Sequence, residues 1–192
     1  MEGGRKQRKW QHLVRVIASF NMSPSAHPSS LIILGIDPGF DRTGFGLITH
    51  SGMAQTWMTH GCIQTHAGLT FAERIIIVKQ ELKKLLDLHK PDCVAVEDLF
   101  FSNNAKTAVK VGMARGVIIL TIAEAGIPIV ELTPNQVKQG LTGYGAADKR
   151  QVQDMVQRSL KLKERPTPDD AADALAIAMV GAYVYKQKIL LK

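Results

Sequence analysis

The stretch LIILGIDPGF, residues 31–40, joins an apolar run to the carboxylate of Asp37. Its aliphatic residues, bounded by Gly35, Pro38 and Gly39, predict a buried strand. Burying an unpaired carboxylate costs several kcal/mol, so Asp37 must emerge where the strand ends. Asp-Pro-Gly is also ordinary turn chemistry, and Asp37 by itself therefore indicates no function.

The composition predicts one globular domain preceded by a basic extension. The chain has 192 residues, of which 45% are hydrophobic, and one domain takes roughly 100–200 residues. The formal net charge is +7, but residues 1–30 hold five Lys and Arg against one Glu, so the charge indicates a nucleic-acid partner only weakly. Residues 1–30 are interpreted as a flexible extension, either a DNA-binding or targeting arm or the product of a start codon placed too far upstream. Residues 31–192 form the expected functional domain.

Cysteine usage and hydropathy indicate the compartment. Cys62 and Cys93 lie in apolar surroundings without C-x-x-C spacing, which argues against a zinc site and against a disulfide-rich secreted fold. The longest apolar run, residues 174–185, is shorter than the roughly 18 residues that a membrane span requires. We therefore expect a cytoplasmic protein without a membrane partner.

Hydrophobic periodicity predicts strands first and then an alternation of helices with strands. The predicted strands cover residues 31–37, 44–49, 53–63, 93–97 and 127–132. The predicted helices cover residues 70–90, 105–125, 149–160 and about 168–185. Thr167 can cap the last helix, with Pro168 at its first helical position. The first three strands would form an antiparallel meander and the later ones would pair parallel, so we expect an α/β fold.

Carboxylates stand at the ends of two strands and at the start of one helix. Asp37 and Glu97 end strands, while Asp170 and Asp173 share one face of the last helix. Parallel pairing would bring all four to one sheet edge, where hard divalent cations make such a cluster tolerable. Mg²⁺ or Mn²⁺ is favoured over zinc, and two such ions about 3.5–4 Å apart can cleave a phosphodiester. Asp169 has a helix-compatible spacing to Asp173 as well, so spacing does not separate it from Asp170.

Four motifs carry a family resemblance. They are LGIDPG with TGFG, VAVEDLFFSNNAKTAVKVGMARGV, PNQVKQGLTGYGAADKRQVQ and DDAADALAIA, in this order. Together they resemble the RuvC family of bacterial Holliday junction resolvases over residues 31–185. The resemblance implies a ribonuclease H-like mixed sheet, an antiparallel meander plus parallel strands, with helices on both faces. It also implies a homodimer that resolves four-way DNA junctions by paired symmetric nicks in recombination and repair, with a branch-migration motor complex as partner.

The resemblance also assigns roles to individual residues. The catalytic and metal-binding carboxylates are Asp37, Glu97, Asp170 and Asp173, with two Mg²⁺ ions per active site and Mn²⁺ as the alternative. The DNA-binding residues are Phe100, Lys138, Lys149 and Arg150. An exposed ring can stack on an unpaired base for about 1–3 kcal/mol, and either Phe100 or its neighbour Phe101 would do so while the other packs in the core. Lys138 and Lys149 would contact phosphates, which locates the DNA backbone without reading its sequence.

Three other interpretations are less compatible with the sequence. The actin and sugar-kinase group also places an acid after a first strand, but it needs a second Gly-rich phosphate loop such as D-x-G-G-G, which this chain lacks. A junction-binding protein that has lost catalysis is the alternative from outside the enzymes, and the presence of all four acids speaks against it. Another ribonuclease H-like nuclease is the third alternative, and the DDAADALA segment fits the RuvC pattern better.

Overall fold

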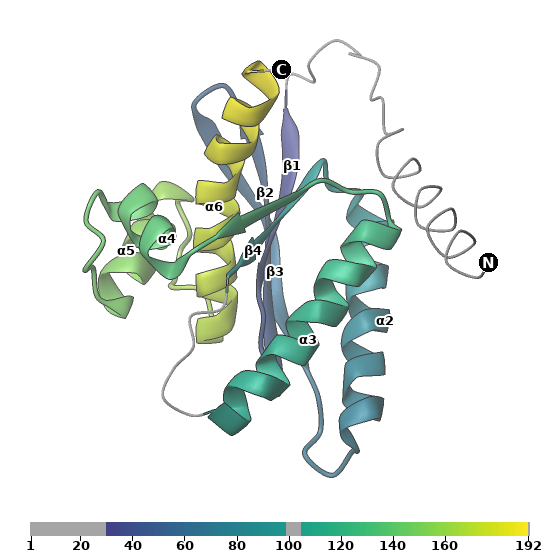
Figure 1. The fold of residues 1–192 in the computed structure, drawn as a ribbon. Coiled ribbons are helices and arrows are strands. Elements are labelled where there is room, and N and C mark those ends of the chain that lie inside the picture. Colours follow the sequence, from purple (N-terminus) through teal and green to yellow (C-terminus); the bar gives the residue numbers. More distant parts are fainter. Residues whose placement is uncertain (1–29, 99–104, 192) are drawn as a thin grey trace, which may run out of the picture.

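The structure, a computed structural model, describes residues 30–98 and 105–191 (Figure 1). In chain order its elements are β1 (Leu31–Asp37), β2 (Arg42–Ser51), β3 (Ala54–Gln64), α2 (Phe71–His89), β4 (Cys93–Glu97), α3 (Ala105–Glu124), β5 (Ile129–Leu132), α4 (Pro134–Thr142), α5 (Lys149–Ser159) and α6 (Asp169–Leu190). Residues 1–29, nearly all of the expected basic extension, lie outside the described part. The division into an extension and a nuclease domain therefore stays a prediction.

Within the described residues, five strands form one sheet in the order β3-β2-β1-β4-β5. The pairs β1–β2 and β2–β3 are antiparallel, whereas β1–β4 and β4–β5 are parallel. The mixed sheet expected from the sequence is confirmed. The second strand begins at Arg42, two residues earlier than expected, because β2 stays paired with β3 as far as Gln64.

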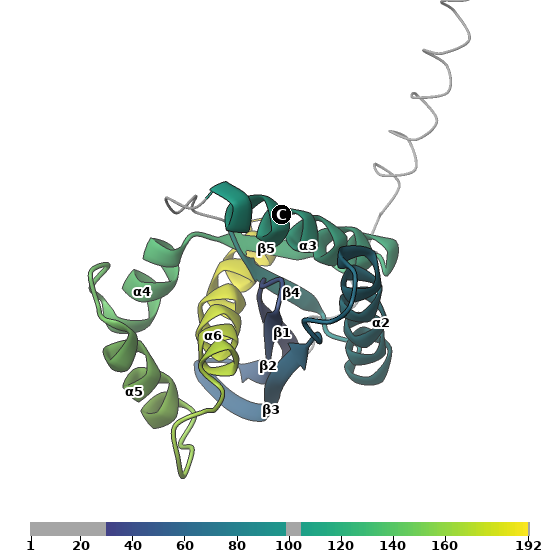
Figure 2. The same ribbon diagram turned by 90° about the horizontal axis from the view of Figure 1, so that it is seen from below.

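Helices cover both faces of the sheet, as expected. One face carries α2 and α3, and the other carries α6, with α4 and α5 outside it (Figure 2). Neighbouring side chains on a strand point to opposite faces, so each strand contributes to two cores. In β1, Leu34 and Ile36 pack with residues of α2 and α3, while Ile33 packs with residues of α6. Both faces of the sheet are thus covered by helices, and β1 and β4 carry their acidic side chains, Asp37 and Glu97, at the strand ends.

The residues buried in the helices follow the hydrophobic periodicity from which the helices were predicted. Along one face of α2, Val78, Leu82 and Leu86 are buried at a spacing of four. Most of α6 is buried because the sheet covers one of its sides and α4 and α5 cover another. Over residues 30–98 and 105–191, no helix has both the length and the apolar character that crossing a membrane would require.

Small residues allow α6 to lie very close to the sheet. A Cβ built on Gly35 would lie 2.0 Å from the carbonyl oxygen of Ala174, and one built on Gly181 would lie 2.3 Å from the Cβ of Ala95. A side chain at either position would push helix and sheet apart. These contacts set how closely α6 packs on the sheet, and the first turn of the helix lies at its lower end in Figure 1.

Two helix starts differ from the prediction. α4 was not predicted, although Thr133 and Gln136 form a reciprocal capping box that starts it. The prediction that Thr167 caps the last helix was wrong, because Pro168 is the N-cap residue and no side chain caps this end. The helix therefore begins directly with its acids, Asp169 and Asp170.

Candidate active site

Asp37 and Glu97 lie side by side because they end two neighbouring parallel strands. The register of β1 and β4 runs to the pair Ile36 and Val96, so the next residue of each strand stands at the same edge. Together with Asp173, these two acids line a pocket of about 310 Å³ that α4 and α5 close from the side. The structure thus brings three of the four predicted carboxylates into one pocket.

Gly44 allows the start of α6 to reach these strand ends. In the register of β1 and β2, Gly44 lies opposite Asp37. A Cβ on Gly44 would lie 2.0 Å from the carbonyl oxygen of Asp170, so no side chain fits there. The first turn of α6 therefore lies directly on the sheet and brings Asp170 and Asp173 towards Asp37. The TGFG motif contained this signal, because a glycine inside a strand often marks a close backbone approach.

The structure separates Asp170 from Asp169, which their spacing in the sequence did not. The side chain of Asp170 is 24% exposed, against 61% for Asp169. Arg42 Nε donates a hydrogen bond to Asp170 Oδ2 at 2.7 Å, and Arg42 Nη2 contacts the same oxygen. Asp169 instead accepts a hydrogen bond from Gln153 of α5. The charge of Asp170 contributes to the raised pKa of Asp37, after burial and the charges of Glu97 and Asp173, although its function as a metal ligand stays a prediction.

Burial and mutual repulsion favour the protonated form of these acids. Burial, followed by the charges of Glu97, Asp173 and Asp170, raises the pKa of Asp37 from 3.8 to about 7. Burial and Asp173 together raise the pKa of Glu97 from 4.5 to about 7. The pKa of Asp173 is also raised, mainly by burial, while Lys149 acts in the opposite direction. Carboxyl groups perturbed in this way within a cleft are typical of a functional site.

Two of the predicted DNA-binding lysines border the carboxylates. Lys149 Nζ lies 3.2 Å from Asp173 Oδ2 and 3.2 Å from Asp169 Oδ2. Lys138, on α4, lines the same pocket, and its charge counteracts the rise in the pKa of Glu97. Both lysines therefore stand where they could contact a phosphate next to the acids.

The other predicted contacts have different positions. Arg150 is exposed on the first turn of α5 and does not line the pocket. Phe100 and its alternative Phe101 belong to residues 99–104, which lie outside the described part of the chain. One contact was missed by the sequence reasoning: Arg42, at the start of β2, forms an ion pair with Asp170. Its only signal was its position next to the TGFG motif, on which α6 rests.

The donor chemistry fits a hard divalent cation, because carboxylate oxygens are the ligands that Mg²⁺ and Mn²⁺ prefer. Over the described ranges, 30–98 and 105–191, no three His, Cys, Asp or Glu side chains lie close enough together to hold a metal ion as they stand. The ion pairs give a physical reason, since Arg42 holds Asp170 and Lys149 holds Asp173. A metal ion would therefore compete with two internal cations for these carboxylates.

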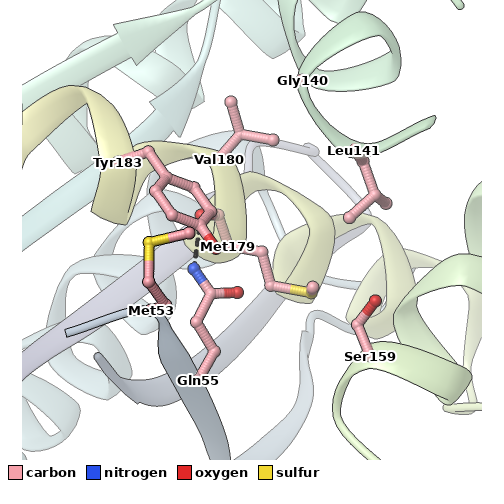
Figure 3. A pocket seen from close by; sticks show the side chains of 8 residues that line it. All are labelled: Met53, Gln55, Gly140, Leu141, Ser159, Met179, Val180 and Tyr183. Carbon is pink, nitrogen blue, oxygen red and sulfur yellow. Dashed lines mark hydrogen bonds between the residues drawn. The ribbon is translucent and has the colours of Figure 1, made fainter. Parts of the chain in front are cut away.

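A second pocket, of about 290 Å³, lies along α6 beside the β2–β3 hairpin (Figure 3). It is lined by Met53, Gln55, Gly140, Leu141, Ser159, Met179, Val180 and Tyr183. The amide nitrogen of Gln55 donates a hydrogen bond to the carbonyl oxygen of Met179 at 2.9 Å. None of the eight lining residues is charged, so this pocket provides no carboxylate for a metal and no cation for a phosphate. The carboxylate pocket is the better candidate for an active site.

Comparisons of the sequence agree with the family resemblance. The sequence model of one protein family, described as crossover junction endodeoxyribonuclease RuvC, matches residues 33–181. The crossover junction endodeoxyribonuclease RuvC of Syntrophomonas wolfei is 50% identical over 154 residues, which cover 80% of this chain and 90% of that protein. The protein of the same name from Ruminiclostridium cellulolyticum is 45% identical over 161 residues, which cover 84% and 97% of the two chains.

Solved structures agree with the fold. RuvC from Thermus thermophilus is 35% identical with a TM-score of 0.76, over 82% of this chain and 97% of that chain. The same protein in complex with a Holliday junction substrate gives a TM-score of 0.78 at 35% identity, over 82% and 96%. The yeast mitochondrial Holliday junction resolvase Ydc2, at 15% identity and a TM-score of 0.56, shares the fold.

Proposed function

The chain belongs to the RuvC family of crossover junction endodeoxyribonucleases, and we propose that its catalytic carboxylates are Asp37, Glu97, Asp170 and Asp173. Its substrate is the four-way DNA junction, which it resolves by cutting phosphodiester bonds. The observation that carries the assignment of the site is the convergence of Asp37, Glu97 and Asp173 on one pocket from two strands and one helix. Asp170 does not line this pocket, and its assignment is supported by the close contact of its backbone with Gly44, opposite Asp37 in the sheet, and by its charge, which raises the pKa of Asp37.

A divalent cation, Mg²⁺ with Mn²⁺ as the alternative, is assigned to these carboxylates. With pKa values of about 7, Asp37 and Glu97 are incompletely ionised at neutral pH in the metal-free protein, and a neighbouring dication favours their ionised form. Bound there, two such ions would supply activation of a water molecule and stabilisation of the leaving oxygen. Asp170 and Asp173 would give up their ion pairs with Arg42 and Lys149, which leaves both cationic side chains available to DNA phosphates.

The cationic side chains of the chain itself would position the strand that is cut. Lys138 from α4 and Lys149 from α5 border the carboxylates, so a phosphate that they contact would lie next to Asp37 and Glu97. Arg150, exposed on the first turn of α5 but outside the pocket, would contact the DNA backbone farther from the acids. Contacts of this kind bind the DNA backbone and orient it without reading bases.

A homodimer is supported by an apolar face on α3. Val109, Met113 and Leu120 are 59%, 54% and 53% exposed, and their spacing puts them on one side of the helix. Gly116 lies on the same side, and a Cβ there would meet nothing within 4 Å. A contiguous exposed apolar patch often marks a protein interface, and a two-fold dimer would present two active sites for paired symmetric nicks. The partnership with a branch-migration motor and the cytoplasmic location stay predictions.

The decisive experiment compares a synthetic four-way junction with a linear duplex of the same sequence, each incubated with Mg²⁺, with Mn²⁺ or with EDTA. We expect paired nicks that appear only in the junction and only with metal. Binding to the junction without cleavage under any condition would support the inactive junction-binding alternative. Equal cleavage of the linear duplex would instead indicate another ribonuclease H-like nuclease.

A further inference from the structure

A buried arginine on α2 holds the loop that follows Asp37. Arg74 is 7% exposed, and its Nε donates a hydrogen bond to Thr65 Oγ1 at 2.8 Å. Its Nη2 forms an ion pair with the carboxylate of Asp41, and its guanidinium carbon lies 3.9 Å from the centre of the Phe40 ring. Phe40 and Asp41 are the third and fourth residues after Asp37 in the chain. Arg74 therefore ties α2 to the segment that emerges from the active site.

Other contacts leave this loop little freedom. The ring of Phe40 stacks on Phe71, with ring centres 5.1 Å apart, and Lys110 Nζ from α3 lies 5.4 Å from the centre of the same ring. Thr65 Oγ1, the acceptor from Arg74, in turn donates a hydrogen bond to the carbonyl oxygen of Phe40 at 3.2 Å. The contacts of Arg74 and Thr65 thus converge on the same two residues of the loop. Movement of the loop would require this cluster to open.

A contribution to folding stability does not explain why the buried position 74 of α2 carries an arginine. Taking a guanidinium out of water is costly, and well-packed apolar side chains often replace buried ion pairs without loss of stability. The partner carboxylate of Asp41 is 76% exposed, so its ion pair with Arg74 offsets little of that cost. The directional hydrogen bonds and the planar stacking of arginine instead suit the holding of a loop in one conformation.

We propose that Arg74 is a positioning residue for the cleavage reaction: by holding Phe40 and Asp41, it fixes the direction in which the Asp37 carboxylate faces Glu97. This role rests on the proposed function of Asp37 in catalysis. Supporting residues around a metal site typically change affinity or activity by about 10–100-fold, and a misplacement of about 1 Å can cost about 10²-fold in rate.

Arg74→Met tests the role, because methionine fills a similar space without hydrogen bonds. We expect junction binding in EDTA to be unchanged and single-turnover cleavage in Mg²⁺ at saturating protein to fall about 10–100-fold. Amide hydrogen exchange of residues 39–42 in the metal-free protein should become faster. The control is Val78→Ala, one turn further along α2 and 2% exposed, which removes core packing but none of the loop contacts. It should lower the melting temperature and leave both the exchange of the loop and the cleavage rate as in the parent.

Phe40→Leu serves as the second variant if Arg74→Met fails to fold, because it keeps Arg74 and removes the ring that the guanidinium covers. It should show the same pair of changes, faster exchange of the loop and slower cleavage. Parental cleavage despite faster exchange, or slower cleavage without faster exchange, would overturn the inference, as would an equal loss of cleavage in Val78→Ala.

Asp37→Asn is assayed in parallel to separate the two proposals. If it cuts at the parental rate, the proposed active site fails, whereas an inactive Asp37→Asn beside a fully active Arg74→Met refutes the role of Arg74 alone.

Discussion

Replacement of Asp37 by asparagine should stabilise the metal-free protein while abolishing its cleavage of junctions. The pKa of Asp37 rises from 3.8 to about 7 on folding, because of burial first and then the neighbouring acids. At about 1.4 kcal/mol for each unit of pKa, the ionised carboxylate lowers the free energy of unfolding by at most about 4 kcal/mol. The pocket opens to solvent, which screens part of this effect, so we expect a gain of about 2 kcal/mol from asparagine at high pH.

The pH dependence of this gain follows from the sign of the pKa change. Between about pH 4 and pH 7 the unfolded chain releases the proton of Asp37 while the folded protein keeps it. The unfolded state then binds fewer protons, so the stability of the metal-free parent falls as pH rises through this window and levels off above it. Asparagine does not titrate. The stability difference should therefore be near zero at pH 4 and reach about 2 kcal/mol at pH 8, or about 4–8 °C in melting temperature for a chain of this size.

Three measurements on one preparation test this reasoning. Thermal melting in EDTA at pH 4, 6 and 8 measures the stability difference between Asp37→Asn and the parent. Gel-shift binding of a four-way junction in EDTA should be unchanged or tighter, since one charge that repels phosphate is lost. Cleavage in Mg²⁺ should fall by about 10²-fold or more if the carboxylate is a metal ligand. Asp87→Asn is the control, because Asp87 is 63% exposed on α2 and pairs only with Lys83 among the described residues; it should change none of the three.

Two results would contradict this prediction. Cleavage by Asp37→Asn at the parental rate would remove Asp37 from the active site and with it the main support for metal-dependent hydrolysis. A melting temperature equal to that of the parent at pH 8 in EDTA would show that burial of the Asp37 carboxylate beside the other acids does not destabilise the metal-free protein.

Three further predictions follow from the packing and charges. Gly44→Ala should lower the melting temperature and cleavage together, because its Cβ would lie 2.0 Å from the carbonyl oxygen of Asp170, whereas Gly145→Ala, with nothing within 4 Å, should leave the melting temperature unchanged. Lys149→Gln should shift the rise of the pH–rate profile to higher pH, because loss of this cation raises the pKa values of the neighbouring acids; an unchanged profile would separate Lys149 from the reacting groups. Met113→Glu puts a charge on the exposed apolar face of α3, so the variant should sediment as a monomer. On a junction in supercoiled DNA it should make single nicks without the paired second nick. A dimer that persists in sedimentation would exclude the α3 face as the interface.

The order of the elements and two positions of the site could be predicted from the sequence. The apolar runs before Asp37 and Glu97 each indicated a buried strand, and the structure ends β1 and β4 at these two residues. This inference succeeds because it depends on local rules: an apolar run must be buried, and a carboxylate must leave the core. The match of these motifs to one family then determined the class of substrate.

Local rules were insufficient at two helix starts. The capping box of Thr133 and Gln136 was present in the sequence, but α4 has nine residues, too few for its periodicity to stand out. Thr167 had the side chain that suits a cap, yet the helix begins after Pro168 because the packing of α6 against the sheet determines where its first turn lies.

The difference between Asp169 and Asp170, and the cations that pair with the acids, depend on how the elements pack and could not be predicted from the sequence. Asp169 and Asp170 are adjacent in the sequence, and their difference arises from the contact of α6 with Gly44 on a distant strand. Arg42 and Arg74 likewise acquire their partners only when β2, α2 and the loop after Asp37 come together. Hydrophobic periodicity records which side of an element is buried, whereas charge interactions and pKa values depend on distances and burial in space, which arise only when separate elements pack.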